Sequence, residues 1–129
     1  MDSPQLFISH STGDTEWAKA FANALKERGL RVWLDEFEME PGDSFREALE
    51  AALRDSDVLV TLIEQDTLNT PNLFFELGAA IGMGKRVVAI VPKDLDPTQL
   101  PIELRRRRYL LRDTPQETAE ELSHALTAA

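Results

Sequence analysis

The sequence contains no cysteine, and its 129 residues include two histidines, His10 and His124. The chain therefore has no thiol to form a disulfide, attack a substrate or bind a metal, and two imidazoles give little for a zinc site. Basic residues are also few, because 14 Lys and Arg stand against 23 Asp and Glu, for a formal net charge of −9. This negative charge disfavours direct binding to nucleic acid or to an anionic membrane surface.

Long apolar runs are missing as well. No stretch approaches the roughly 20 residues that a membrane-spanning helix needs, and residues 1–4 lack the basic and apolar regions of a signal peptide. We therefore expect a cytoplasmic protein. A length of 129 residues fits a single domain over residues 1–129, because two halves would each be too small to bury a core.

Five short apolar runs, rich in Val, Ile and Leu, recur along the chain. They occupy residues 6–8, 30–34, 58–63, 87–91 and 109–111. Short runs without polar alternation are typical of strands that are covered on both faces. The runs therefore predict a parallel sheet of five strands.

Segments with helical periodicity separate these runs. Asp14 or Thr15 can cap a helix that Gly29 ends, and residues 44–47 and 114–117 have the spacing of a capping box. Each of these signals predicts a helix boundary.

The third predicted helix begins near Thr70 and ends at Gly82 and Gly84. We expect Gly78 and Gly82 to let this helix approach the sheet. Prolines interrupt the segment 93–107, so any helix there is short.

The alternation of strands and helices predicts an α/β fold, a three-layer sandwich with a five-stranded parallel sheet. We expect the flavodoxin-like strand order 2-1-3-4-5, in which the first strand is central. Ligands of such sheets lie outside the carboxyl ends of the strands, where the strand order reverses. Residues 9–11, 35–44 and 64–76 follow the three neighbouring strands, so we expect a site where they meet.

Glu76 falls about one turn into the third predicted helix, at the border of its apolar stripe. A half-buried carboxylate at the mouth of the sheet is a candidate functional group. The alternative is an acidic residue that the helix dipole favours in a first turn, without any function. Spacing alone leaves both interpretations open.

The acidic segment 35–43 contains a Pro-Gly turn, Pro41 and Gly42, and two apolar residues, Phe37 and Met39. A long loop at the ligand edge with large apolar side chains is a lid or a contact surface. A solvated turn between strand and helix is the alternative.

Ordered motifs along the chain resemble the TIR domain, the Toll/interleukin-1 receptor type module of immune receptors and bacterial defence proteins. Residues 6–11 are similar to its first box, with His10 where tyrosine is usual, and Leu34-Asp35 followed by residues 40–42 is similar to its BB loop. Residues 52–63 are similar to the stretch entering its third strand, residues 70–77 to the segment of its catalytic glutamate, and residues 85–92 to its fourth strand.

Two departures from the family pattern stand out. Asn72 lies four residues before Glu76, where many members carry tryptophan, and the family's third box is not recognisable near the C-terminus. The first departure concerns how the nicotinamide is stacked and not the glutamate itself.

The resemblance implies an NAD+ glycohydrolase that cleaves the nicotinamide-ribose bond and gives ADP-ribose or a cyclic ADP-ribose. It implies that Glu76 is catalytic, that NAD+ is a substrate and that no cofactor or metal is required. We expect Ser9, His10, Ser11, Asp35, Phe45 and Asn72 to bind the substrate, with Phe45 beside the nicotinamide.

The resemblance also implies activation by self-assembly, in anti-phage defence or immune signalling. The BB-loop residues Phe37, Met39, Pro41 and Gly42 are expected to make contact between copies. A sensor domain or a partner protein is expected to supply the activating signal.

Two other functions stay open. A TIR adaptor would signal by homotypic contact through Phe37, Met39 and the basic run 105–108, without consuming NAD+. A nucleoside 2-deoxyribosyltransferase has a similar fold and a similar Phe-Glu-Leu-Gly segment, which is residues 75–78 here, and it also attacks an N-glycosidic bond.

Overall fold

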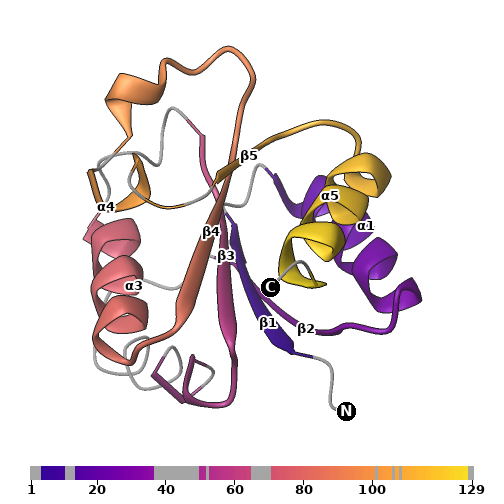
Figure 1. Cartoon of the computed structure of the whole chain (residues 1–129), viewed down its shortest axis with the longest axis horizontal. Helices are drawn as coiled ribbons and strands as arrows, with labels where there is room; N and C mark the ends of the chain where they lie inside the picture. The colour runs from indigo at the N-terminus through magenta and orange to yellow at the C-terminus, as the bar shows by residue number, and fades with distance from the viewer. Residues whose placement is uncertain are drawn as a thin grey trace.

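The computed structural model describes residues 4–10, 14–36, 50–51, 53–64, 71–100, 102–105, 107 and 109–127. These residues form a five-stranded parallel sheet in the order β2-β1-β3-β4-β5, with helices on both of its faces (Figure 1). The predicted α/β sandwich and its flavodoxin-like strand order are confirmed. Within the described ranges, none of the helices combines the length and the apolar character needed to cross a bilayer.

The strands coincide with the apolar runs of the sequence to within two or three residues. They are β1 Gln5–His10, β2 Arg31–Glu36, β3 Val58–Leu62, β4 Arg86–Val91 and β5 Tyr109–Leu111. All five residues of β3 are buried, as expected for a strand covered on both faces. The two edge strands instead carry exposed apolar side chains, Trp33 on β2 and Leu111 on β5.

One face of the sheet is covered by α1 (Thr15–Glu27) and α5 (Pro115–Thr127), which also contact each other. Leu6 and Ile8 of β1 point to this side, where they pack with Phe21 of α1 and Leu122 of α5. Figure 1 shows both helices to the right of the sheet.

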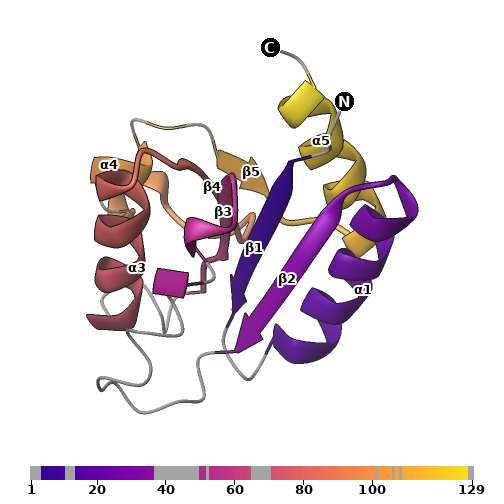
Figure 2. The same cartoon turned by 90° about the horizontal axis from the view of Figure 1, so that it is seen from below.

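The other face is covered by α3 (Pro71–Gly82) and the short α4 (Ile102–Arg105). Phe7 of β1 and Leu59 of β3 pack here with Leu77 and Ala80 of α3. Figure 2 shows α3 and α1 on opposite sides of the sheet. The segment before α4 adds one short 3-10 helix, η3 (Pro97–Gln99), so the prediction of only short helices over residues 93–107 is confirmed.

Glycine ends two helices, as the sequence predicts. Gly29 follows α1 with φ +86°, and Gly84 follows α3 with φ +73°. The Leu30 N–H donates to the carbonyl of Leu25, and an equivalent bond closes α3, so both ends have the pattern of a Schellman motif.

The prediction for the two helical glycines is wrong. Gly78 and Gly82 are exposed, and a Cβ atom on either would meet no atom within 4 Å. The helix periodicity turns both positions away from the face that carries Leu77 and Ala80. Close approach to the sheet is therefore not the reason for these glycines.

The threonine cap of α5 is confirmed. The Glu117 N–H donates to Thr114 Oγ1 at 3.1 Å, whereas the Thr114 N–H donates to Asp113 Oδ1 at 2.8 Å. Asp113 thus takes the acceptor role that a complete capping box gives to the glutamate. The helix predicted from residue 44 begins outside the described residues, and residues 50, 51, 53 and 54 are helical.

Candidate functional site

The strand order reverses between β1 and β3. After β1 the chain enters α1 on one face, and after β3 it enters α3 on the other face. The carboxyl ends of these two neighbouring strands therefore open onto a common edge, which is the expected place for a ligand. Ser9 and His10 are the last two residues of β1.

Ser9 and His10 point to opposite faces of the sheet. Side chains alternate along a strand, so Ser9 shares the face of Phe7, beneath α3, whereas His10 shares the face of Ile8. Both are buried, with exposed fractions of 1% and 0%. Of these two predicted substrate-binding residues, the structure brings Ser9 alone to the side of the sheet that carries Glu76.

Thr61 of β3 is a polar residue that the sequence analysis missed. It lies beside Ser9 in the register of the sheet and is completely buried. Ser9 Oγ and Thr61 Oγ1 have no hydrogen-bond partner among the described residues. A threonine inside the apolar run 58–63 was the available signal, because an aliphatic side chain would fill this position without an unpaired hydroxyl.

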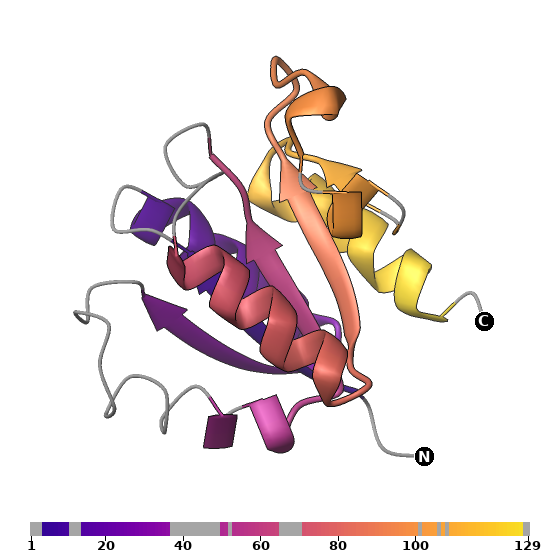
Figure 3. The same ribbon diagram turned by 90° about the vertical axis from the view of Figure 1, so that its left-hand side faces the viewer.

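Glu76 and Asn72 lie in α3, which begins at Pro71. The helix follows the carboxyl end of β3 and returns toward the start of β4, so its first turns are nearest the edge of the sheet where the strand order reverses. Figure 3 shows α3 lying over its face of the sheet. Asp35 lies near the end of β2, in register with Ser9.

The remaining predicted site residues lie outside the described part of the chain. They are Ser11 after β1, the BB-loop residues Phe37, Met39, Pro41 and Gly42, and Phe45. Their assignments stay predictions.

A cleft of about 830 Å³ opens at the carboxyl ends of β3, β4 and β5. Its walls include Trp17 of α1, Glu64 after β3, Lys93 after β4 and Arg112 after β5. Trp17 belongs to the core on the α1 and α5 side, so this cleft opens on the face of the sheet opposite α3. The described lining of this cleft thus lies on the other face of the sheet from α3, the helix that carries Glu76.

Arg112 is the central cation of this cleft. Its Nη1 lies 2.7 Å from Asp14 Oδ1 and 3.9 Å from Glu64 Oε1, and its guanidinium lies 4.5 Å from the centre of the Trp17 ring. Asp14 occupies the N-cap position of α1 but makes no side-chain cap hydrogen bond. Its carboxylate instead binds Arg112 and ties the start of α1 to the end of β5.

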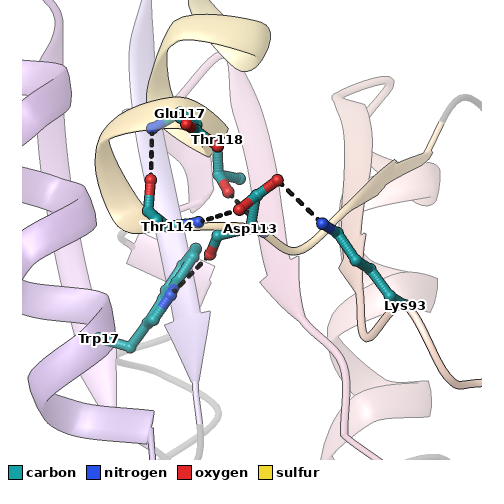
Figure 4. Close-up of polar contacts among 6 residues, drawn as sticks. All are labelled: Trp17, Lys93, Asp113, Thr114, Glu117 and Thr118. Carbon is teal, nitrogen blue, oxygen red and sulfur yellow. Dashed lines mark hydrogen bonds and ion pairs between the residues drawn. The ribbon is translucent and has the colours of Figure 1, made fainter.

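A second ion pair joins Lys93 and Asp113 at 2.9 Å (Figure 4). The hydrogen bond from Lys93 holds the pKa of Asp113 below its ordinary value, and the same bond raises the pKa of Lys93. Repulsion from Asp113 raises the pKa of Glu117. The backbone of Asp113 is also fixed, because its N–H donates to Thr118 Oγ1 and its carbonyl accepts from Trp17 Nε1.

These three ion pairs tie together the chain segments at the ends of β3, β4 and β5 and at the start of α1. Each cation already contacts a carboxylate. Among the described lining residues, three acids (Glu64, Asp94 and Asp113) face two bases (Lys93 and Arg112), which is no excess of positive charge for a phosphate. In the described ranges, no three His, Cys, Asp or Glu side chains gather to hold a metal.

The family model described as TIR domain matches residues 6–127 of the chain. The chain belongs to the TIR domain family. The resemblance seen in the sequence motifs is therefore confirmed, and it extends over almost the whole chain.

This TIR domain is similar in sequence to two bacterial proteins. It is 32% identical over 77 residues to the 2' cyclic ADP-D-ribose synthase AbTIR of Acinetobacter baumannii, a match that covers 59% of this chain and 29% of the relative. It is 38% identical over 52 residues to the NAD(+) hydrolase PdTIR of Paracoccus denitrificans, covering 40% of this chain and 17% of that protein. The chain thus spans less than a third of the length of either relative.

A solved structure supports the fold. The CMP N-glycosidase BcmB of Clostridium botulinum superposes with a TM-score of 0.64 at 17% identity, over 93% of this chain and 98% of that one. At this identity the likeness concerns the architecture alone.

Proposed function

We propose that this TIR domain cleaves NAD+ at the bond between nicotinamide and ribose, with Glu76 as the catalytic carboxylate. The names of the two relatives, an NAD(+) hydrolase and a 2' cyclic ADP-D-ribose synthase, support this activity. The observation that carries the proposal is the place of Glu76 in the second turn of α3. That turn follows the carboxyl end of β3, at the edge where a sheet of this order binds its ligand.

The chemistry requires little from the protein. The nicotinamide of NAD+ is cationic, so it takes the bonding electron pair and departs as a neutral molecule without a proton from a general acid. The ribose left behind acquires oxocarbenium character, and a carboxylate close to its hydroxyls stabilises that positive charge. One ionised acid is sufficient, which suits a chain without cysteine and with two histidines.

The product depends on which oxygen attacks the ribose. If water forms the new C–O bond and loses a proton, the product is ADP-ribose. If a hydroxyl of the same molecule attacks, the product is a cyclic ADP-ribose. In this proposal Ser11, Asp35, Phe45 and Asn72 contact the substrate, with Phe45 beside the nicotinamide, whereas the buried Ser9 and His10 support the site from within the sheet.

The proposal also includes self-assembly. Residues 1–129 form one TIR domain, and copies of this domain contact each other. Phe37, Met39, Pro41 and Gly42 of the BB loop would contact a second copy, and clustering by a sensor domain or partner protein in the cytoplasm would activate NAD+ cleavage in defence or immune signalling. Support for this part comes from the family resemblance and from the apolar residues of the loop.

The direct test is incubation of concentrated protein with NAD+, followed by chromatography for nicotinamide, ADP-ribose and cyclic products. We expect the wild type to release nicotinamide and Glu76→Gln to lose at least about 100-fold in turnover, as for the loss of an electrostatic stabiliser. Glu120→Gln is the matched control, because the Glu120 side chain is 55% exposed and lies on α5. Its turnover should equal that of the wild type.

Other outcomes distinguish the alternatives. Concentration-dependent assembly without any loss of NAD+ would favour the adaptor. Release of free base from deoxynucleosides, with NAD+ untouched, would favour an enzyme like the nucleoside 2-deoxyribosyltransferases.

A further inference from the structure

Oxygen-bearing residues form a row across the sheet near its carboxyl edge. Asp35 of β2, Ser9 of β1 and Thr61 of β3 are in register with one another, and Ala89 of β4 continues the row. The row below it, two residues earlier on each strand, consists of Trp33, Phe7, Leu59 and Val87 and has no side-chain oxygen. The polar character is therefore confined to the end of the sheet where the strand order reverses.

The two hydroxyls of this row are buried without a hydrogen-bond partner, which is unusual in proteins. Ser9 is 1% exposed and Thr61 is 0% exposed, and neither side-chain oxygen has a hydrogen-bond partner among the described residues. A buried hydroxyl without a partner destabilises the folded protein, and most such groups in proteins are paired. Two such hydroxyls side by side at the expected ligand edge indicate a polar group to which they can donate hydrogen bonds.

Both hydroxyls face the layer that contains α3. Thr61 shares the face of Leu59 and Ile63, which pack on the α3 side of the sheet, as Ser9 shares that of Phe7. The helix itself contacts β4, the neighbour of β3. Of the two hydroxyls, that of Thr61 is thus one strand closer to α3.

The helix geometry indicates which residue of α3 lies over this row. Ala80 packs with Leu59 and Val87 of the apolar row. One turn toward the start of α3 is a shift of about 5.4 Å, and two residues along a strand toward its carboxyl end are a shift of about 6.6 Å. Because α3 runs opposite to the strands, the position four residues before Ala80 comes over the row that contains Thr61. That position is 76.

We propose that Thr61 is a positioning residue for Glu76, to whose carboxylate its hydroxyl donates a hydrogen bond, directly or through one water that Ser9 also contacts. This inference rests on the proposed function for its consequence in catalysis, but the contact itself can be tested without any turnover.

A hydroxyl donor on a carboxylate has two effects. It favours the charged form, which lowers the pKa of the acid, and it restricts the carboxylate to one orientation. Both suit a group that must be ionised and aimed at a ribose. The other titratable residue of the row is Asp35, two strands from Thr61, and the α3-side core residues next to the row are apolar.

The test is a titration of the Glu76 carboxyl carbon by NMR, assigned from its loss in Glu76→Gln. Thr61→Val keeps the shape of the side chain and removes the donor, so we expect the pKa of Glu76 to rise by about 1 unit. Thr61→Ser retains the hydroxyl and should restore the wild-type pKa. An unchanged pKa of Glu76 in Thr61→Val would overturn the proposal.

Stability and turnover supply independent readouts. Val fills the same space and leaves no buried hydroxyl to be satisfied, so the melting temperature of Thr61→Val should stay within a few degrees of that of the wild type. In the same variant, kcat for NAD+ cleavage should fall about 10-fold at unchanged KM, because the donor to Glu76 is lost. A merely structural threonine would instead lose melting temperature, and Ser would not rescue kcat. If Thr61→Val does not fold, Thr61→Ala replaces it in the titration.

Thr118→Val is the matched control. Thr118 is also completely buried, but it lies on α5 in the opposite layer and its Oγ1 accepts the Asp113 N–H. This variant should lower the melting temperature and leave the pKa of Glu76 unchanged. If the wild type does not cleave NAD+ but Thr61→Val still raises that pKa, the proposed function fails and the contact stands.

Discussion

Arg112 and Asp14 form an ion pair at 2.7 Å across a separation of 98 residues. The pair joins the turn after β5 to the start of α1, and the same guanidinium covers the ring of Trp17. The Asp14 side chain is 3% exposed and that of Arg112 is 23% exposed. A carboxylate so buried depends on its cation, because removal of one partner leaves an uncompensated charge.

We predict that Arg112→Ala lowers the free energy of unfolding by about 2–3 kcal/mol, since it strands the Asp14 carboxylate and uncovers Trp17. Urea unfolding followed by circular dichroism measures the change. Arg28→Ala is the control, because Arg28 pairs with Glu120 at 4.0 Å on the exposed surface and should cost less than about 1 kcal/mol. Equal losses in the two variants would contradict a structural role for the buried pair.

The glycines in and after α3 lead to a second prediction, in which two alanine substitutions change the stability in opposite directions. Gly84→Ala should destabilise by about 1 kcal/mol, because φ +73° is a left-handed conformation that alanine adopts at a cost. Gly78→Ala should stabilise by about 0.5–1 kcal/mol, because position 78 is helical, exposed and free of neighbours within 4 Å. Thermal unfolding of the two variants tests both signs, and a loss at position 78 would restore the close-approach interpretation.

The sequence was sufficient for the fold because its local signals agree with each other. The apolar runs gave strands such as β3 and β4 almost to the residue, and Gly29, Gly84 and Thr114 marked the helix ends that the structure has. Each of these signals acts within a few residues, where periodicity and backbone conformation decide the outcome.

The candidate site was less accessible, because it depends on which residues become neighbours in space. Ser9 and His10 are adjacent in sequence, yet strand alternation sends them to opposite faces. Thr61 is 52 positions away from Ser9, and only the pairing of β1 with β3 brings the two together. The pair of Arg112 with Asp14 likewise required knowledge of where β5 ends relative to α1.

The Lys93–Asp113 pair makes a prediction about titration. Asp113 raises the pKa of Glu117 by repulsion and that of Lys93 by its hydrogen bond. Asp113→Asn should therefore lower both pKa values toward the ordinary 4.5 and 10.5. NMR titration of the two side chains measures the shifts, and added salt should reduce those of the wild type. No change in Glu117 would rule out Asp113 as the cause.

The pH dependence of stability follows from the same three groups, and the direction of the effect differs from one group to the next. Asp113 has a lowered pKa, so its stabilising effect is present above the unfolded value of 3.8 and is lost as pH falls through the folded value. Lys93 has a raised pKa, so its effect is present below 10.5 and is lost as pH rises through the folded value. Glu117 has a raised pKa and opposes Asp113, because the destabilising repulsion between the two carboxylates disappears when acid protonates Glu117.

We predict that Lys93→Met loses little stability at neutral pH, and that the difference in stability between this variant and the wild type vanishes in strong acid.

The proposed chemistry makes its own prediction about pH. If Glu76 acts by charge alone and the nicotinamide leaves without protonation, kcat for NAD+ cleavage should rise with pH through one ionisation and then stay level. A general acid would add a falling limb at higher pH, which gives the bell-shaped profile of two titrating groups. Steady-state rates between about pH 4 and 9, the range over which carboxyl and imidazole groups titrate, decide between the two forms. A bell would show that a second group transfers a proton, and would contradict catalysis by the charge of Glu76 alone.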